Sequence, residues 1–555
     1  MDLARLLPRT PLLPLVLVAL GAAGCADTPT PLPATDAGAA DAATSPDASS
    51  GGGDAGTACG ATAALVGPGL ARTTTGLAEG VEVTAPGGPV WAWRGLPYAA
   101  PPLGALRWRP PEAPACWADT RRFERFGPKC PQLTEDGAYE GDEDCLTLNV
   151  WAPVGGAARP VWVFLHGGGN TVGAASEPLY DGALAAAEQG LVVITVQYRL
   201  GALGFFSHPA LDAERAERVS GNYGLLDQQA ALRWVRDNVA AFGGDPAKVL
   251  LFGESAGAQD TLAHFVSPGA AGLARAMLVQ SGGYYSQTLA EGHAAMTAVV
   301  DAVGCSAGAE PLPCLRGTSA EALVRVPAAI GPLELGLKYR PVIDGVVIPD
   351  DPERLLREGR GQPIPLVVGS NADETSRMVP AVRTEAEYRE YVTARFAGLA
   401  PQVLAQYPAS AFATPRQALV RLTTDVVWTC PTRRILRWVE AAGRAPTYRY
   451  FFDARGPGAA GQIVGATHGF ELAFVFGNFS VLQGFMPDAG LAALGRQMRD
   501  HWASLAATGT PAPTAAVAWP AYVGADDAAL RLAQPIEVLR GVRTEGCDFW
   551  DGLGL

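Results

Sequence analysis

The stretch KVLLFGESAGAQDTLAHF, Lys248 to Phe265, decides the fold of this chain. Its first five residues predict a short buried strand, and the residues from Ala256 onward predict a helix. The turn between them is GESAG, which places Ser255 at a sharp strand-to-helix reversal. The glycines two residues before and after this serine leave room for two backbones to approach closely. The pattern is typical of a nucleophilic serine, but it is short enough to arise by chance, so the rest of the chain must support it.

Strands and helices alternate on both sides of this stretch. Residues 222–242 carry apolar side chains at helical spacing, and a Gly-Gly-Asp-Pro run stops that helix. Residues 61–93 alternate short apolar runs with Gly/Pro turns, which predicts an antiparallel meander at an edge. Other buried strands are predicted by five apolar runs, at residues 146–151, 161–165, 191–196, 276–280 and 364–368. This alternation predicts a doubly wound α/β sheet.

The composition fits one large folded domain. The chain has 555 residues, of which 48% are hydrophobic and 17% charged, enough for an extensive core. We expect residues 59–555 to form a single domain, because large α/β enzymes often exceed the usual domain length. The net charge of -13 argues against nucleic acid as a partner. Nothing in the sequence specifies an oligomeric state.

The N-terminal segment predicts export. Residues 1–24 combine two arginines, a short apolar run and small residues before a cleavage site, as in a signal peptide. Cys25 follows Ala-Ala-Gly and resembles a bacterial lipobox cysteine, although Ala22 stands where leucine is usual. We therefore expect a lipoprotein on the cell envelope that contacts the membrane only through Cys25, with simple secretion as the alternative. Residues 25–58, with the anchor cysteine first, predict a disordered tether rich in Ala, Asp, Pro, Gly and Ser.

The cysteines fit an oxidising compartment. If Cys25 is lipidated, eight of the nine cysteines remain, and disulfides are the default for an exported protein. Cys305 with Cys314 is the favoured local pair, and Cys130 with Cys145 the next. No Cys-x-x-Cys pair or Cys/His cluster offers a metal site, so no metal is expected.

A nucleophilic serine needs a base, and the six histidines differ as candidates. His468 stands in Ala-Thr-His-Gly-Phe, a predicted loop before a buried helix, and is the best candidate. His264 lies about two and a half helical turns from Ser255 and points elsewhere. His501 falls on an amphipathic run, where a surface or packing role is expected. His208 and His293 fall on polar, loop-like stretches.

Two further stretches complete the candidate site. His166 begins the run HGGG at the end of a predicted strand, and its glycines expose backbone N–H groups of the kind that stabilise an oxyanion, unless the run is an ordinary turn. Asp373 and Glu374 follow another strand, where they form either a solvated turn or the acid that orients the base. The order serine, acid, histidine is that of α/β-hydrolases.

With these motifs in order, the chain resembles a type B carboxylesterase of the cholinesterase-like branch of the α/β-hydrolases, from about residue 81 to 550. The matching motifs are EDCLTLNV from Glu143, HGGG from His166, GNYGLLDQQAALRWV from Gly221, GESAG from Gly253, GSNADET from Gly369 and THGFELAFVFG from Thr467. The resemblance implies a large, mostly parallel central sheet with helices on both faces.

The resemblance also implies a role for each site residue. Ser255 is the nucleophile, Glu374 rather than Asp373 the acid, and His468 the base. The oxyanion hole and two supporting positions are implied at Gly168, Gly169 and Ala256, and at Glu254 and Ser281. The implied disulfides join Cys130 with Cys145, Cys305 with Cys314 and Cys430 with Cys547, which leaves Cys59 for Cys116.

Departures from the resemblance bear on the substrate. The segment between Cys130 and Cys145 contains Tyr139 but no tryptophan to hold a choline cation, so a dedicated cholinesterase is rejected. Arg377, just after Glu374, either meets a polar or anionic substrate or pairs with a surface carboxylate. Tyr284 either lines the acyl pocket or packs in the core.

We therefore expect a hydrolase of small-to-medium carboxylic esters that works through an acyl-enzyme on Ser255 and needs no cofactor. A specialised hydrolase of a toxin ester or a lactone shares every motif and stays open. A non-catalytic adhesion module on the same scaffold is the other alternative, although such modules typically lose the serine or the histidine.

Overall fold

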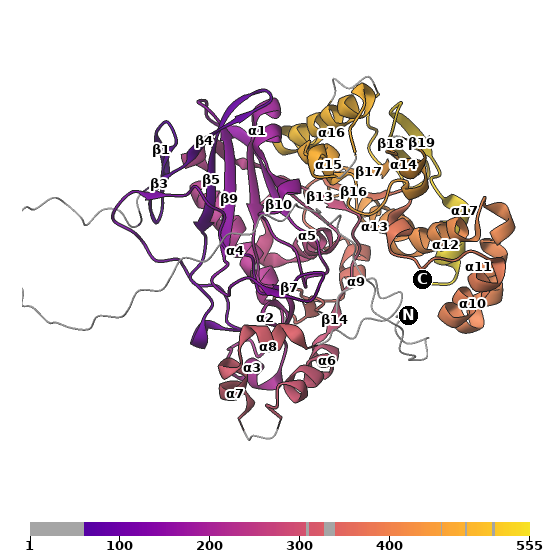
Figure 1. Ribbon diagram of the computed structural model, residues 1–555, viewed down its shortest axis with the longest axis horizontal. Helices are drawn as coiled ribbons and strands as arrows, with labels where there is room; N and C mark the ends of the chain where they lie inside the picture. Colours follow the sequence, from indigo (N-terminus) through magenta and orange to yellow (C-terminus); the bar gives the residue numbers. More distant parts are fainter. Residues whose placement is uncertain are drawn as a thin grey trace, which may run out of the picture.

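The computed structural model describes residue 60 and residues 62–306, 310–326, 339–456, 458–482, 485–512 and 517–554. The expected signal peptide and tether, with Cys25 and Cys59, lie outside these residues. An 11-stranded sheet runs through the body of the molecule (Figure 1). Its strands, in spatial order, are β19 (Glu537–Arg540), β18 (Ala528–Leu532), β17 (Thr447–Phe452), β16 (Leu366–Asn371), β13 (Ala276–Gln280), β12 (Gly244–Glu254), β10 (Arg159–Leu165), β11 (Val192–Val196), β9 (Thr147–Pro153), β5 (Gly88–Pro97) and β4 (Val81–Ala85).

The middle of this sheet is parallel and its two edges are antiparallel. Every neighbouring pair from β11 to β18 is parallel, whereas β9, β5 and β4 at one edge and β19 at the other pair antiparallel. Parallel strands with helical crossovers confirm the predicted α/β-hydrolase class. The predicted strands at 276–280 and 191–196 match β13 and β11 to within one residue.

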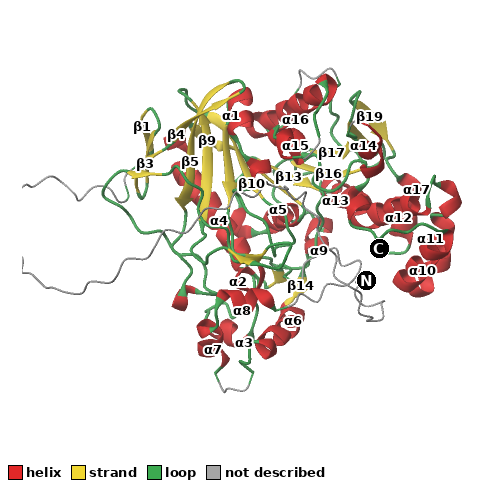
Figure 2. Ribbon diagram, in the orientation of Figure 1, coloured by secondary structure: helices red, strands yellow, loops and turns green. Residues whose placement is uncertain are grey.

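Alternate side chains of each central strand enter two separate cores. In β10, Val161, Val163 and Leu165 face one core, while Trp162 and Phe164 face the other, and all five are fully buried. One core is covered by α4 (Tyr223–Asn238), α5 (Ala256–Val266), α9 (Pro352–Arg357) and α13 (Cys430–Ala441). The other is covered by α1 (Ala183–Gln189), α15 (Leu472–Phe476) and α16 (Ala489–Thr508). Figure 2 shows these helices around the sheet.

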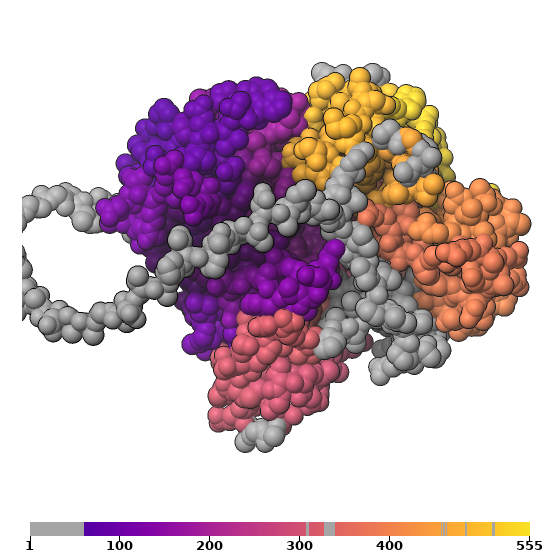
Figure 3. All heavy atoms as spheres, in the orientation of Figure 1, coloured from indigo at the N-terminus to yellow at the C-terminus, as the bar shows by residue number. Residues whose placement is uncertain are grey.

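Two helical lobes project from this body and stand out in the space-filling view (Figure 3). Each has its own apolar cluster. The first lobe contains α2 (Gly201–Gly204), α3 (Pro209–Ala213), α6 (Leu289–Ala302), α7 (Pro311–Gly317) and α8 (Ala320–Arg325). The second contains α10 (Glu385–Phe396), α11 (Ala400–Gln406), α12 (Pro415–Thr424) and α17 (Thr544–Gly552).

Three disulfides lie among the described residues, and one of them links the second lobe to the body. The three bonds join Cys130 with Cys145, Cys305 with Cys314, and Cys430 with Cys547. Cys116 is disulfide-bonded as well, and its expected partner Cys59 lies outside the described residues. Disulfides are typical of exported proteins. No helix among the described residues has the length and apolar character needed to cross a membrane.

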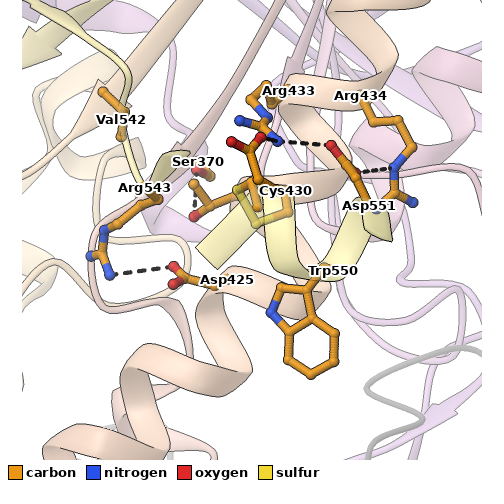
Figure 4. Close-up of a disulfide and its surroundings, with 12 residues drawn as sticks. Ser370, Asp425, Cys430, Arg433, Arg434, Val542, Arg543, Trp550 and Asp551 are labelled. Atoms are coloured by element: carbon orange, nitrogen blue, oxygen red, sulfur yellow. Dashed lines mark hydrogen bonds and ion pairs between the residues drawn. A yellow bond between two sulfur atoms is a disulfide. The ribbon is translucent and has the colours of Figure 1, made fainter. Parts of the chain in front are cut away.

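The longest of these disulfide loops fastens the C-terminal helix α17 to α13, and ion pairs surround it (Figure 4). Asp551 of α17 binds Arg433 at 2.7 Å and Arg434 at 3.0 Å. Arg543, just before α17, lies 3.3 Å from the buried Asp425. Asp548 of α17 binds Arg433 as well, at 2.7 Å, so among the described residues one disulfide and four ion pairs hold α17 and the preceding Arg543 against the segment 425–434.

The edge meander expected at 61–93 forms two separate sheets. A small sheet contains β1 (Ala64–Gly67), β2 (Leu70–Thr73), β3 (Gly76–Glu79) and β6 (Arg121–Arg122), of which β3 and β6 are parallel. Only β4 and β5 join the edge of the main sheet. The short apolar runs predicted the strands, but the pairing of β3 with the distant β6 is a long-range contact that no local pattern specifies.

Candidate active site

The carboxyl ends of four central strands converge on the site. β12 lies between β10 and β13, with Gly253 beside Leu165 and Glu254 beside Gln280, and β16 lies next to β13. Residues that follow these strands therefore meet at one edge, where α/β sheets bind their ligands. They are His166 to Gly169 after β10, Ser255 after β12, Ser281 after β13 and Glu374 after β16.

Ser255 sits on a strained turn between β12 and α5. Its backbone has φ 56° and ψ −120°, in a region that side-chain-bearing residues rarely adopt. A Cβ on Gly253 would lie 2.3 Å from the Gly257 backbone, and a Cβ on Gly257 would lie 2.1 Å from the Leu165 carbonyl oxygen. Both glycines are therefore required by backbone contact, as the GESAG pattern predicts.

Glu374 and His468 form a hydrogen-bonded pair beside this turn. His468 Nδ1 lies 2.7 Å from Glu374 Oε2, and the Glu374 side chain is fully buried. The backbone N–H of Asn371 donates to Glu374 Oε1 at 2.7 Å, and the backbone N–H of His468 donates to the Glu374 carbonyl at 3.1 Å. The carboxylate therefore receives the imidazole Nδ1–H, which leaves Nε2 free to act as a base.

A second carboxylate faces the other nitrogen of this histidine. Glu254 Oε1 lies 3.2 Å from His468 Nε2, and Glu254 is buried. Burial favours the neutral ring, but the charges of Glu254 and Glu374 outweigh it and raise the pKa of His468 to about 9. Burial also raises the pKa of Glu254. The protonation of His468 therefore depends on the charge of Glu254.

Two neighbours of His468 were not predicted from the sequence. Glu471, three residues further on, is fully buried and accepts from Asn371 Nδ2 at 2.5 Å and Gln280 Nε2 at 3.2 Å. Burial, with the nearby carboxylates, raises the pKa of Glu471 to about 8. A glutamate within the apolar run Phe-Glu-Leu-Ala-Phe-Val-Phe was the available signal, because an ionisable group there must be paired or perturbed.

The other missed neighbour is Trp428. Its ring lies 5.1 Å from that of His468, and its Nε1 donates to the Ser281 carbonyl at 3.0 Å. It is carried by η9 (Asp425–Thr429), a single π-helical turn between α12 and α13. Such turns often occur at functional sites, but they have no sequence signature that would have identified this one.

Three backbone N–H groups lie without acceptors next to Ser255. A Cβ on Gly167 would approach Ser255 Cβ to 3.0 Å, so the glycine run packs directly on the turn. Gly168 and Gly169 have φ of 106° and 66°. Within the described residues, the N–H groups of Gly168, Gly169 and Ala256 donate to no protein acceptor. Unpaired backbone N–H groups of this kind can stabilise a developing oxyanion.

Comparison with known proteins agrees with this geometry. The model of the Carboxylesterase family matches residues 68–550. The chain belongs to the carboxylesterase family. It is 38% identical over 480 residues, 82% of this chain and 85% of the relative, to fumonisin B1 esterase of Sphingopyxis macrogoltabida. It is 34% identical over 451 residues, 78% of this chain and 89% of the relative, to para-nitrobenzyl esterase of Bacillus subtilis (strain 168). The chain is a carboxylic ester hydrolase.

Two serines predicted for the site of this carboxylesterase have no side-chain hydrogen bond to the other predicted site residues within the described part of the chain. Among the described residues, no hydrogen bond connects Ser255 Oγ with His468, whose Nε2 faces Glu254 instead. Ser281 is buried with φ 53°, and its Oγ has no partner in the described part of the chain. Its backbone N–H donates to the Gly369 carbonyl at 2.9 Å, which links β13 to β16 at the site.

The three expected pocket residues lie in different surroundings. Tyr284 is half-buried and packs against Trp438 of α13, with ring centroids 5.6 Å apart, at the margin of the core on one face of the sheet. Tyr139 is half-buried in β8 (Tyr139–Glu140), which pairs with β7 (Gln132–Leu133). Arg377 is exposed in η6 (Glu374–Arg377).

The other four histidines of the carboxylesterase lie outside the candidate site, in the core or at helices. His264 and His501 are fully buried, and burial lowers their pKa values to about 3 and about 4. His208 begins α3, where its ring accepts the Ala210 N–H. The loop expected around His293 was wrong, because this residue lies in α6, 3.0 Å from Asp212. A Thr-x-x-Glu capping box at the start of α6 was the signal that would have identified the helix.

Proposed function

We propose that this carboxylesterase hydrolyses esters through an acyl-enzyme on Ser255, with His468 as general base and Glu374 as its orienting acid. The observation that carries the proposal is the 2.7 Å hydrogen bond from His468 to buried Glu374 beside the strained Ser255 turn. The unpaired N–H groups of Gly168, Gly169 and Ala256 support it as the oxyanion hole.

In the proposed cycle, His468 takes one proton from Ser255 and passes it to the leaving alcohol. Ser255 Oγ attacks the ester carbonyl while its proton passes to His468 Nε2, and the tetrahedral oxyanion is bound by the three N–H groups. The imidazolium then gives the proton to the leaving alcohol. Water repeats the sequence on the acyl-enzyme and releases the acid. Nε2 must turn from Glu254 toward Ser255 in the substrate complex, in keeping with catalytic hydrogen bonds that tighten only when substrate is bound.

Pre-steady-state kinetics test this cycle. Mixing the purified protein with an excess of p-nitrophenyl acetate is expected to release a burst of about one equivalent of p-nitrophenolate per protein before the linear phase, provided that deacylation is slower than acylation. The acetylated protein should be visible by mass spectrometry of samples quenched in acid. A burst whose quenched protein carries no acetyl group on Ser255 would contradict the proposed covalent mechanism.

The charge of Glu254 is expected to set the pH dependence of this reaction. His468 must be neutral to accept a proton, so kcat/KM falls as the pH drops through the pKa of the coupled pair. Because the Glu254 carboxylate raises the pKa of His468, Glu254→Gln is expected to move the acidic limb of the profile to lower pH. The exposed Glu321→Gln serves as a control that leaves the limb in place. An unchanged limb in Glu254→Gln would show that this carboxylate does not act on the base.

A second candidate function is narrower. One similar protein is named for fumonisin B1, and the other for a para-nitrobenzyl ester. We propose that esters of either class enter this site, and kcat/KM for fumonisin B1 and for p-nitrobenzyl acetate decides between them. A ratio of 100 or more, on the order of 3 kcal/mol in transition-state binding, would identify a specialised toxin esterase. Comparable values would indicate a broad carboxylesterase.

A further inference from the structure

The loop that carries the proposed oxyanion hole is held by an asparagine in an unusual conformation. Gly168, Gly169 and Asn170 form a run with positive φ, and Asn170, at 53°, is the member with a side chain. Asparagine tolerates this region better than most residues, but only at some cost. Asn170 is fully buried, and its carbonyl accepts the Gly201 N–H at 2.6 Å.

The Asn170 side chain is fixed by a carboxylate from the helix that follows the nucleophile. Asn170 Nδ2 donates to Asp260 Oδ1 at 3.2 Å, and the Tyr198 hydroxyl lies 3.4 Å from Asn170 Oδ1. Asp260 belongs to α5, which begins immediately after Ser255. One side chain therefore connects the helix of the nucleophile to the loop of the oxyanion donors.

Asp260 itself lies in a closed polar network. It is fully buried, and Gln228 Nε2 of the neighbouring helix α4 donates to its Oδ2 at 2.7 Å. Gln228 Oε1 in turn lies 2.7 Å from His264 Nε2. Within the described residues, no Lys, Arg or His forms an ion pair with Asp260. Only amide donors compensate this carboxyl group, and burial raises its pKa to about 7.

Burying a carboxyl group without a cation is costly, and an apolar residue at this position of α5 would avoid that cost. Helix packing alone therefore does not explain a carboxyl group at position 260. Its two acceptor oxygens are both used, one on α4 and one on Asn170. A different side chain, Gln132, holds the far end of the same loop. Its amide oxygen accepts the Gly173 N–H at 2.8 Å, and its amide nitrogen donates to the Gly173 carbonyl at 2.9 Å.

We propose that Asp260 is a positioning residue for ester hydrolysis: it holds Asn170, and through it aims the N–H groups of Gly168 and Gly169 at the site of the oxyanion. This inference rests on the proposed function of those two N–H groups. Asp260 touches no substrate, so its removal should weaken transition-state binding while it leaves ground-state binding nearly unchanged.

Matched variants separate this role from general packing. Asp260→Leu removes both acceptors, whereas Asp260→Asn keeps one oxygen for Asn170. Gln228→Leu and Gln229→Leu change neighbours on α4. In the part of the chain that the structure describes, the Gln229 side chain donates to Ser267 Oγ at 3.0 Å and not to the loop. The readouts are kcat and KM for p-nitrophenyl acetate, and the inhibition constant of an aryl trifluoromethyl ketone, whose adduct places an oxyanion in the hole.

We expect Asp260→Leu to lower kcat and the affinity for the ketone by a similar factor, roughly 10- to 100-fold, with KM changed less than about threefold. Asp260→Asn should recover most of kcat, and Gln228→Leu should lose more than Gln229→Leu. A folded Asp260→Leu with unchanged kcat and ketone affinity would overturn the inference, as would equal losses in the two glutamine variants.

A third variant keeps the inference testable if Asp260→Leu does not fold. Asn170→Gly accepts the positive φ without strain and removes only the side-chain link, so it should show the same split between kcat and KM. Wild-type kinetics in Asn170→Gly would overturn the inference. Failure of the proposed function is distinguishable, because the wild-type protein would then not be modified at Ser255 by an organophosphonate.

Discussion

Replacing Ser255 with alanine is expected to lower kcat for p-nitrophenyl acetate on the order of 10⁶-fold, because the proposed acyl-enzyme needs the Ser255 hydroxyl. KM should change far less, since the proposed oxyanion donors, the N–H groups of Gly168, Gly169 and Ala256, stay in place. Alanine retains the Cβ that the turn already accommodates, so the variant should fold with the wild-type free energy of unfolding. The comparison needs protein purified free of other esterases, with activity followed to background.

Ser267→Ala is the matched control for this variant. Ser267 follows the other end of α5, is buried, and accepts a hydrogen bond from Gln229. It should keep wild-type kcat. If Ser255→Ala retained more than about 1% of wild-type kcat, Ser255 could not be the nucleophile.

The second large effect is expected for Glu374→Gln, about 10⁴-fold in kcat. The Asn371 N–H donates to Oε1, so the amide oxygen of the new glutamine should stay there, and its NH₂ group should face His468 Nδ1. Nδ1 would then have to accept, which places the imidazole proton on Nε2. That tautomer cannot take the proton of Ser255.

The neighbouring carboxylate supplies the control for this prediction. Asp373 pairs with Arg455 at 2.9 Å and accepts the Ala466 N–H at 3.2 Å, and it does not contact His468. Asp373→Asn is therefore expected to keep kcat within about tenfold of the wild type. Similar losses in the two variants would contradict the assignment of Glu374 as the acid.

Local sequence patterns predicted the parts of this molecule that local geometry determines. The GESAG turn needs its two glycines because their Cβ atoms would meet backbone, and that requirement is visible in the sequence. The central strands were predicted as apolar runs because both faces of a parallel sheet are buried. Glu374 and His468 were reached through chain order and resemblance, because 94 residues separate them and no local pattern relates them.

The parts that could not be predicted depend on long-range packing. The contact of Glu254 with His468 Nε2 and the approach of Trp428 each bring a side chain to the histidine from a different element. The π-helical turn that aims Trp428 arises within a longer helical run. The same holds for Asp260, which meets Asn170 across 90 residues of chain.

Modification by an organophosphonate tests the central claim most directly, because the reagent stays on the residue that attacks it. The intact mass should rise by one phosphonyl group as esterase activity is lost, and peptide sequencing should place that group on Ser255. Ser255→Ala should remain unmodified, and Glu374→Gln should react much more slowly than the wild type. An active protein whose phosphonyl group sits on another residue, or that loses activity without any adduct at Ser255, would contradict the account.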